Sequence, residues 1–92
     1  MTAKARLVLL SRAWCHLCDD MRDALNALAT AHEFDLEIVD VDNEPELERR
    51  YGEDVPVLLG NGRELSRHRL DPARVTAYLG AFSGAAGSNP LE

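Results

Sequence analysis

The order of the first three segments constrains the fold of this chain more than any other feature. Residues 5–11 form a short apolar run rich in Leu and Val, which predicts a strand covered on both faces. Across 15–32 the apolar residues recur at helical spacing, and 35–41 predicts a second strand. The apolar stripe of the predicted helix consists of Leu17, Met21, Leu25 and Leu28. A strand, a long helix and a strand in this order predict a parallel pair joined by a right-handed crossover.

The second half of the chain predicts a short helix followed by a hairpin. Asn43 and Glu46 have the spacing of a capping box at the start of the short helix, and Gly52 is placed to end it. Residues 57–65 contain two strand-like segments around Asn61-Gly62, a pair that is typical of two-residue turns. The two flanking strands are therefore expected to be antiparallel.

A last helix is predicted to begin at Asp71-Pro72. The element order is then β-α-β-α-β-β-α, an α/β fold with a four-stranded mixed sheet flanked by helices. We expect residues 1–92 to form a single domain, with its core at about 4–82 and a flexible tail at 83–92.

The chain is small and acidic, with 92 residues and a formal net charge of −6. An acidic surface disfavours nucleic acid, whose backbone is bound through Lys and Arg. The apolar run 7–10 is too short for a secretory signal, and no segment predicts a membrane span, so we expect no membrane partner. We expect a cytoplasmic monomer. In that compartment thiols stay reduced, and a close cysteine pair is more often catalytic or metal-binding than structural.

The segment Trp14-Cys15-His16-Leu17-Cys18 carries the clearest chemical signal, because it lies between the first predicted strand and the first predicted helix. Unpaired N–H groups and the helix dipole favour negative charge at that position, so Cys15 is predicted to have a lowered pKa and to react as a thiolate. Two intervening residues place Cys18 where it can attack a mixed disulfide at the Cys15 sulfur. A C-x-x-C motif at such a junction predicts that Cys15 and Cys18 are catalytic.

Two other interpretations of the cysteine pair stay open. The cysteines could be a chance pair without chemistry, or they could bind a metal ion or cluster. Structural zinc requires four ligands, whereas the chain has only two cysteines. The histidines are scattered along the sequence at His16, His32 and His68. We therefore predict no metal site within one chain, and a cluster shared between two chains is a further alternative.

Asp54-Val55-Pro56 precedes the third predicted strand. With the element order and the C-x-x-C motif after the first strand, it makes the chain resemble the glutaredoxin-like branch of the thioredoxin superfamily over about residues 4–82. The resemblance implies a thioredoxin-like fold, a cis peptide bond before Pro56 that faces the active site, and pairing of the Val55 backbone with substrate. Pro56 by itself, at a strand start and without a ladder donor, is compatible with a cis bond or with an ordinary trans proline.

The sequence differs from typical members of this family at two places. His16-Leu17 stands between the cysteines in place of Pro-Tyr or Gly-Pro, which leaves the redox potential open. Residues 66–69, Ser-Arg-His-Arg, stand in place of a Gly-Gly-Asp-like segment that typically holds glutathione. Arg67 is a candidate for binding a substrate carboxylate bidentately, and the alternative is a solvated basic turn.

Three other side chains near Cys15 are candidate substrate contacts. Trp14 is expected to form an exposed rim for a partner, and His16, when protonated, to stabilise the Cys15 thiolate. Arg12 is the nearby cation that is always charged, so it is a candidate for attracting the carboxylates of glutathione. Because acidic residues surround the same site, glutathione is expected to bind more weakly than in ordinary glutaredoxins.

The resemblance implies a thiol–disulfide oxidoreductase that serves cell redox homeostasis. Its substrates would be disulfides in proteins or small molecules, which are reduced by dithiol exchange. No tightly bound cofactor is expected, and electrons would come from glutathione or from a flavoprotein reductase. The rival interpretation is a non-catalytic thioredoxin-fold module that senses redox state or binds a metal or a partner.

Overall fold

The computed structural model describes the backbone of residues 5–87 and the side chains of residues 5–81. It confirms the expected element order, with one additional turn of 3-10 helix called η1. The elements are β1 (Ala5–Ser11), α1 (His16–Leu28), β2 (Phe34–Asp40), η1 (Val41–Asn43), α2 (Pro45–Tyr51), β3 (Val57–Gly60), β4 (Arg63–Arg67) and α3 (Pro72–Gly87).

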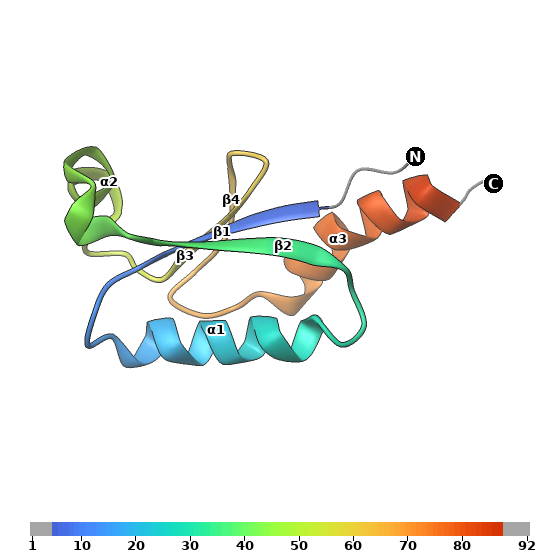
Figure 1. The fold of residues 1–92 in the computed structure, drawn as a ribbon, viewed down its shortest axis with the longest axis horizontal. Coiled ribbons are helices and arrows are strands. Elements are labelled where there is room, and N and C mark those ends of the chain that lie inside the picture. The colour runs from blue at the N-terminus through green and yellow to red at the C-terminus, as the bar shows by residue number, and fades with distance from the viewer. Residues whose placement is uncertain (1–4, 88–92) are drawn as a thin grey trace.

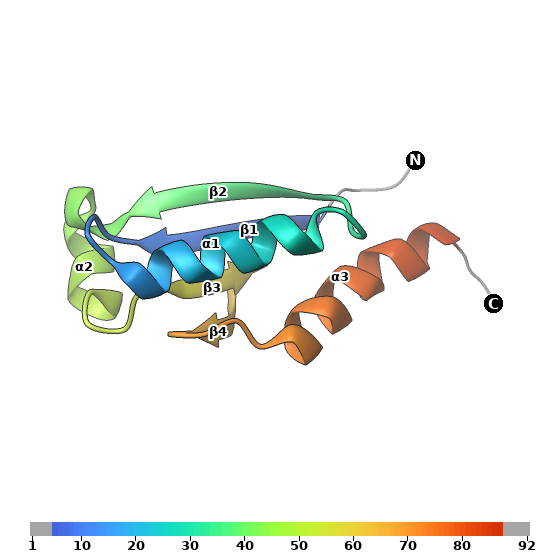
Figure 2. The same cartoon turned by 90° about the horizontal axis from the view of Figure 1, so that it is seen from below.

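The four strands form one mixed sheet in the order β2-β1-β3-β4, as expected from the sequence (Figures 1 and 2). β1 pairs in parallel with β2 along its whole length. On its other side β1 pairs antiparallel with β3, where Leu10 lies opposite Val57. β1 is therefore an inner strand, and its residues are apolar on both faces because each face packs against a hydrophobic cluster.

β3 and β4 form the predicted antiparallel hairpin. The two turn residues, Asn61 and Gly62, have φ angles of 54° and 78°. Both values lie in the left-handed region that a type I′ turn requires, and Asn and Gly tolerate this region better than other residues. The local Asn-Gly signal therefore determined the turn.

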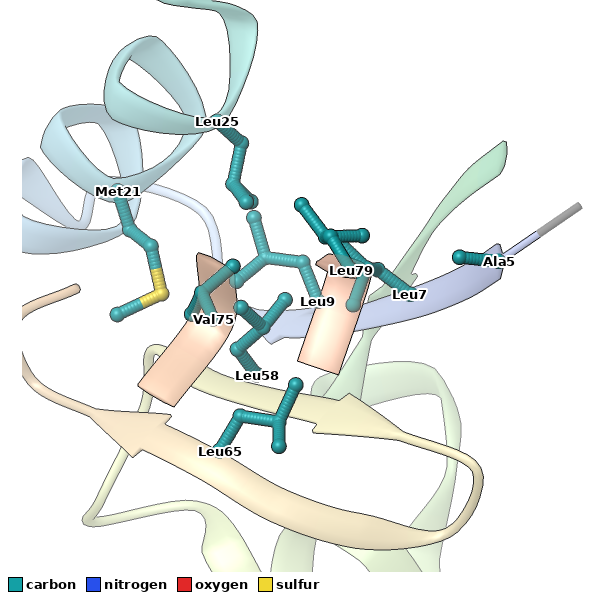
Figure 3. Packing of buried hydrophobic residues seen from close by; sticks show 9 residues of the cluster. All are labelled: Ala5, Leu7, Leu9, Met21, Leu25, Leu58, Leu65, Val75 and Leu79. Carbon is teal, nitrogen blue, oxygen red and sulfur yellow. The ribbon is translucent and has the colours of Figure 1, made fainter. Parts of the chain in front are cut away.

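The larger hydrophobic cluster lies between one face of the sheet and two helices, α1 and α3 (Figure 3). Full burial of a large apolar side chain stabilises the fold by about 1.5–3 kcal/mol relative to exposure. The buried members are Ala5, Leu7, Leu9, Met21, Leu25, Leu58, Leu65, Val75 and Leu79. On the opposite face, Leu10, Val41 and Val57 form a smaller cluster against Leu47 and Tyr51 of α2. The side chains of β1 alternate between these two clusters, as the pleat of a strand requires.

The inward stripe of α1 differs from the expected one at its start. The helix buries Cys18, Met21 and Leu25. Leu17 was expected in this stripe, and that expectation is wrong, because its side chain is 41% exposed. Cys18, which follows it, takes the inward position with only 4% exposure.

The α1 helix ends at Leu28, earlier than the sequence pattern predicts. The Thr30 hydroxyl donates to the Ala27 carbonyl at 2.8 Å. In a longer helix that carbonyl would accept the N–H of Ala31, which instead donates to the Leu28 carbonyl at 3.0 Å. Competition of this kind from a Thr side chain is a common reason for a helix to tighten and stop.

The capping box expected at the start of α2 is wrong. The N-cap is Glu44, and no side chain caps the helix, while Asn43 is the last residue of η1. Pro45 occupies the first turn, where its missing N–H would have had no helical partner. Gly52 ends α2 as predicted, but with a right-handed φ of −54°. Close packing explains this glycine instead, since a Cβ there would lie 2.5 Å from the Glu48 carbonyl oxygen.

The last helix, α3, begins at the predicted Pro72, and the Asp71 carboxylate accepts the Arg74 N–H at 3.2 Å. Its backbone stays helical as far as Gly87. The first part of the expected tail at 83–92 is therefore helical, and 88–92 lie outside the described residues. Within residues 5–87, no helix has the length and the apolar character needed to cross a membrane.

The start of α1, the helix α2 and the start of β3 gather at one end of the sheet, opposite to the start of β1 and the end of α3 (Figures 1 and 2). Because β1 and β3 are antiparallel, the last residues of β1 lie beside the first residues of β3. The loop that leads to Cys15 and the Val55-Pro56 segment therefore lie at the same end of the sheet.

Candidate active site

Cys15 is the N-cap residue of α1. Its backbone is extended, with φ −114° and ψ 106°, and its Sγ accepts a hydrogen bond from the Cys18 N–H at 3.1 Å. A Ser, Thr, Asp or Asn oxygen usually has this role. The Cys15 carbonyl accepts the Asp19 N–H at 3.1 Å, the first bond of the helix. The sulfur thus lies at the positive end of the helix dipole and next to a backbone donor, and both features favour a thiolate.

A disulfide joins Cys15 to Cys18, with the two Cα atoms 5.2 Å apart. This separation is within the usual range for a disulfide. Cys18 belongs to the first turn of α1 and is buried, whereas Cys15 is half-buried. Cys15 is therefore the more accessible residue of the pair, and Cys18 lies behind it.

Trp14, directly before the disulfide, is fully exposed at 100%. The predicted exposed rim is thus present, and its contact with a substrate stays a prediction. The φ of Trp14 is 62°, in the left-handed region that bulky residues rarely adopt. Strained backbone such as that of Trp14 concentrates at functional sites. His16 and Leu17, which follow Cys15 in the sequence, are also exposed.

The Val55–Pro56 peptide bond is cis, which confirms what the family resemblance implied. Pro56 is buried and Val55 is half-buried. The Pro56 carbonyl accepts the His68 N–H at 2.8 Å, which joins the start of β3 to the turn after β4. Pairing of a substrate with the Val55 backbone stays a prediction.

Arg12 follows directly after β1 and binds groups within the chain. Its Nη2 and Nε donate to Asp42 Oδ1 at 2.8 and 3.2 Å. Its Nη1 donates to the Gly52 carbonyl at 2.8 Å, and Nη2 also lies 3.3 Å from a carboxylate oxygen of Glu48. The hydrogen bond that the guanidinium donates to Asp42 is the main cause that raises the pKa of Arg12. A direct role for Arg12 in substrate binding stays a prediction, and it would require the guanidinium to exchange these partners.

Arg67 lies at the end of β4, opposite Val57, so the sheet brings it to the same end as Pro56. Its guanidinium binds both carboxylate oxygens of Glu64 at 2.7 Å, and it lies 3.1 Å from Asp54. The hydrogen bond between Arg67 and Glu64 raises the pKa of Arg67 and lowers the pKa of Glu64. The bidentate geometry expected for Arg67 is thus formed with a carboxylate of the same chain, and binding of a substrate carboxylate stays a prediction.

A cavity of about 350 Å³ opens between the first half of α1 and the turn after β4. Leu17, Met21 and Leu70 line it with apolar surface, and Asp20 and Arg69 add one charge of each sign. Among the residues that the structure describes, no group of three or more His, Cys, Asp or Glu side chains is placed to hold a metal ion. The arrangement therefore offers thiol chemistry at Cys15 and a partly apolar hollow that begins at Leu17 of the same helix.

The partners of the two arginines were not predicted from the sequence. Asp42, Glu48 and the Gly52 carbonyl surround Arg12, and Glu64 binds Arg67. Asp42, Glu48 and Gly52 lie 30, 36 and 40 residues from Arg12 in the sequence, so only the tertiary structure decides that they meet it. Glu64, in contrast, stands only three residues before Arg67.

Residues 6–80 match the Glutaredoxin-like domain (DUF836). The chain belongs to this glutaredoxin-like family. One relative, the uncharacterized protein Rv0508 from Mycobacterium tuberculosis, is 32% identical over 82 residues, which cover 84% of each chain. The solution NMR structure of protein Ne2328 from Nitrosomonas europaea is 34% identical, with a TM-score of 0.79, and the match covers 86% of this chain and 95% of that one.

More distant structures place this glutaredoxin-like chain in the thioredoxin fold. A reduced thioredoxin pre-protein from Schistosoma mansoni is 22% identical with a TM-score of 0.61, and the match covers 88% of this chain and 81% of that one. Over residues 5–87 the fold is therefore a thioredoxin-like α/β fold with three α-helices and a four-stranded mixed sheet. Both the family and the fold expected from the sequence are confirmed.

Proposed function

We propose that the protein is a thiol–disulfide oxidoreductase that reduces disulfides by dithiol exchange. In this proposal Cys15 is the nucleophile and Cys18 is the resolving thiol. The observation that carries it is the position of Cys15 Sγ, which caps α1 and accepts the Cys18 N–H at 3.1 Å. A sulfur at this position is stabilised as a thiolate, and the thiolate is the reactive form in exchange.

The reaction balances in two steps. The Cys15 thiolate attacks one sulfur of the substrate disulfide, so a Cys15–substrate bond forms, the substrate S–S bond breaks, and the leaving sulfur takes a proton. Deprotonated Cys18 then attacks Cys15 Sγ, forms the intramolecular disulfide and releases the second substrate sulfur as a thiol. The substrate gains two electrons and the protein loses two. A pair of thiols from an external donor returns them by the reverse exchange.

The difference in burial supports this division of roles. Cys18 is 4% exposed, and Cys15 is half-buried beside the exposed Trp14. An external disulfide therefore reaches Cys15 first, and Cys18 acts once the mixed disulfide is formed. The two residues between the cysteines keep the second thiol within one helical turn of the first.

We further propose that the electron donor is a flavoprotein reductase rather than glutathione, and that the protein works in the reducing cytoplasm. Glutathione carries two carboxylates, and its capture needs free cations near Cys15. Arg12 and Arg67 are occupied by carboxylates of the chain itself. Asp19 and Asp20 in the first turns of α1 are exposed and repel an anion.

The experiment uses Cys15→Ser and Cys18→Ser with a peptide that contains one disulfide, followed by mass spectrometry. We expect Cys18→Ser to accumulate a mixed disulfide through Cys15, and Cys15→Ser to form none. Equal trapping by both variants would contradict the assignment of roles, and no turnover by the wild-type protein with either reductant would contradict the proposed function. Comparing coupled turnover with glutathione and with a thioredoxin reductase tests the donor.

A further inference from the structure

The side chain of Arg12 joins three segments of the fold at the same end of the sheet as the disulfide. Its guanidinium donates to Asp42 of η1, to the Gly52 carbonyl at the end of α2, and lies 3.3 Å from Glu48 within α2. The side chain is 32% exposed. A planar guanidinium has five donors in a fixed fork, so several simultaneous partners restrict its position and orientation.

Arg12 connects the two segments that lead to the residues of the proposed active site. Arg12 lies in the loop that leads from β1 to Cys15, and Gly52 lies in the segment that leads from α2 to Val55 and Pro56. The Gly52 carbonyl is at a helix end, where carbonyls lack helical partners and attract cations. Arg12 therefore donates a hydrogen bond to the Gly52 carbonyl, which would otherwise bind water, and connects Gly52 to the loop before Cys15.

Close packing at Gly52 leaves little freedom in this contact. A Cβ at Gly52 would lie 3.2 Å from Arg12 Nη2 and 2.9 Å from Glu48 Oε2. The guanidinium thus lies directly against bare backbone, and the position is buried. A contact this tight transmits a shift of one segment to the other, since packed groups cannot deform continuously.

We propose that Arg12 is a positioning residue, which holds the Cys15 loop at a fixed place relative to the Val55–Pro56 segment. This inference rests on the proposed function, because the positioned event is attack of Cys15 on a disulfide that lies along the Val55 backbone. It differs from a substrate-binding role, in which the charge of Arg12 would attract the substrate or the thiolate. The charge of Arg12 is matched instead by Asp42 and Glu48.

The test compares Arg12→Met and Arg12→Lys with the control Arg49→Met. Arg49 forms an ion pair with Glu46 inside α2, and that pair connects no two segments. Two rates are measured on each reduced protein: exchange with a peptide that contains one disulfide, and alkylation of Cys15 by iodoacetamide across a pH range. Exchange requires the Val55–Pro56 segment, whereas alkylation requires only the Cys15 thiolate.

We expect Arg12→Met to slow the exchange with the peptide by about 10- to 100-fold, the effect typical of a small misplacement of a reacting group. The pH midpoint of alkylation should stay the same. Arg12→Lys should also be slow, because one ammonium cannot bind three partners at these positions. Arg49→Met should match the wild type. Full rescue by Arg12→Lys, an unchanged exchange rate in Arg12→Met, or a higher alkylation midpoint in Arg12→Met would each overturn the inference.

A second measurement does not depend on any catalytic activity. Hydrogen exchange of the Asp19 amide reports on the start of α1, and that of the Asp54 amide reports on the segment after α2, since both donate to backbone carbonyls there. In Arg12→Met both amides should exchange about tenfold faster or more, and in Arg49→Met neither should change. If the wild type exchanges no disulfide, the proposed function fails, while unchanged protection in Arg12→Met would show separately that Arg12 does not couple the two segments.

Discussion

Replacing Trp14 by Gly is expected to stabilise the protein, although it removes the only tryptophan of the chain. Trp14 has a φ of 62°, and its side chain is 100% exposed. The left-handed conformation costs an L-residue about 1–2 kcal/mol, and glycine adopts it freely. The exposed ring offsets none of this cost, because it buries no apolar surface.

The expected magnitude follows from two opposing effects. Glycine removes the left-handed cost, but it loses about 0.5–1 kcal/mol more backbone entropy on folding than other residues. The net gain in unfolding free energy is therefore about 0.75 kcal/mol at the middle of the two ranges, and at most about 1.5 kcal/mol. The middle value corresponds to a rise of about 3–6 °C in Tm for a domain of this size. Trp14→Ala is the matched control, since it removes the ring and keeps the Cβ that causes the strain. Its stability should stay close to that of the wild type.

The assay is urea unfolding followed by far-UV circular dichroism, with the Cys15–Cys18 disulfide intact in all three proteins. Tryptophan fluorescence is unsuitable because both variants lack the fluorophore. If Trp14→Gly is no more stable than Trp14→Ala, the strain argument is wrong. Both variants lose the ring equally, so a fall in exchange with a peptide disulfide that is common to both would be assigned to the ring rather than to the backbone.

Two further predictions concern the core and the acid stability. Leu25→Ala removes a side chain of α1 that is 0% exposed in the larger cluster, so the unfolding free energy should fall by about 2–5 kcal/mol, and a loss below 1 kcal/mol in urea unfolding would contradict this packing. The hydrogen bond from Arg67 lowers the pKa of Glu64, so this carboxylate stabilises the fold above its unfolded pKa of about 4.3 and loses that contribution as the pH falls through the lower folded value. The difference in unfolding free energy between the wild type and Glu64→Gln should therefore shrink as the pH falls from 6 to 3, and a constant difference would show that Arg67 does not stabilise the carboxylate.

The cysteines of the candidate site could be identified from the sequence because their environment is local. Cys15 stands where the buried strand has ended and the amphipathic helix begins, so its place at the helix N-terminus does not depend on what the helix packs against. The N-cap of α1 is indeed Cys15. The cis bond before Pro56 was implied by the family resemblance rather than by a physical argument from its neighbours. The partners of Arg12 could not be predicted, because Asp42 and Gly52 are distant in the sequence and meet Arg12 only through folding.

The sequence by itself determined the element order, the burial of β1 on both faces and the hairpin turn at Asn61-Gly62. These features depend on periodicity and backbone preferences within a few residues, which act before any tertiary contact forms. The tertiary structure decided that Cys18 rather than Leu17 faces the core, and which carboxylates bind Arg12. Consecutive helical residues point about 100° apart, so two apolar neighbours compete for one inward direction, and the packing of α1 against the sheet and α3 selects between them.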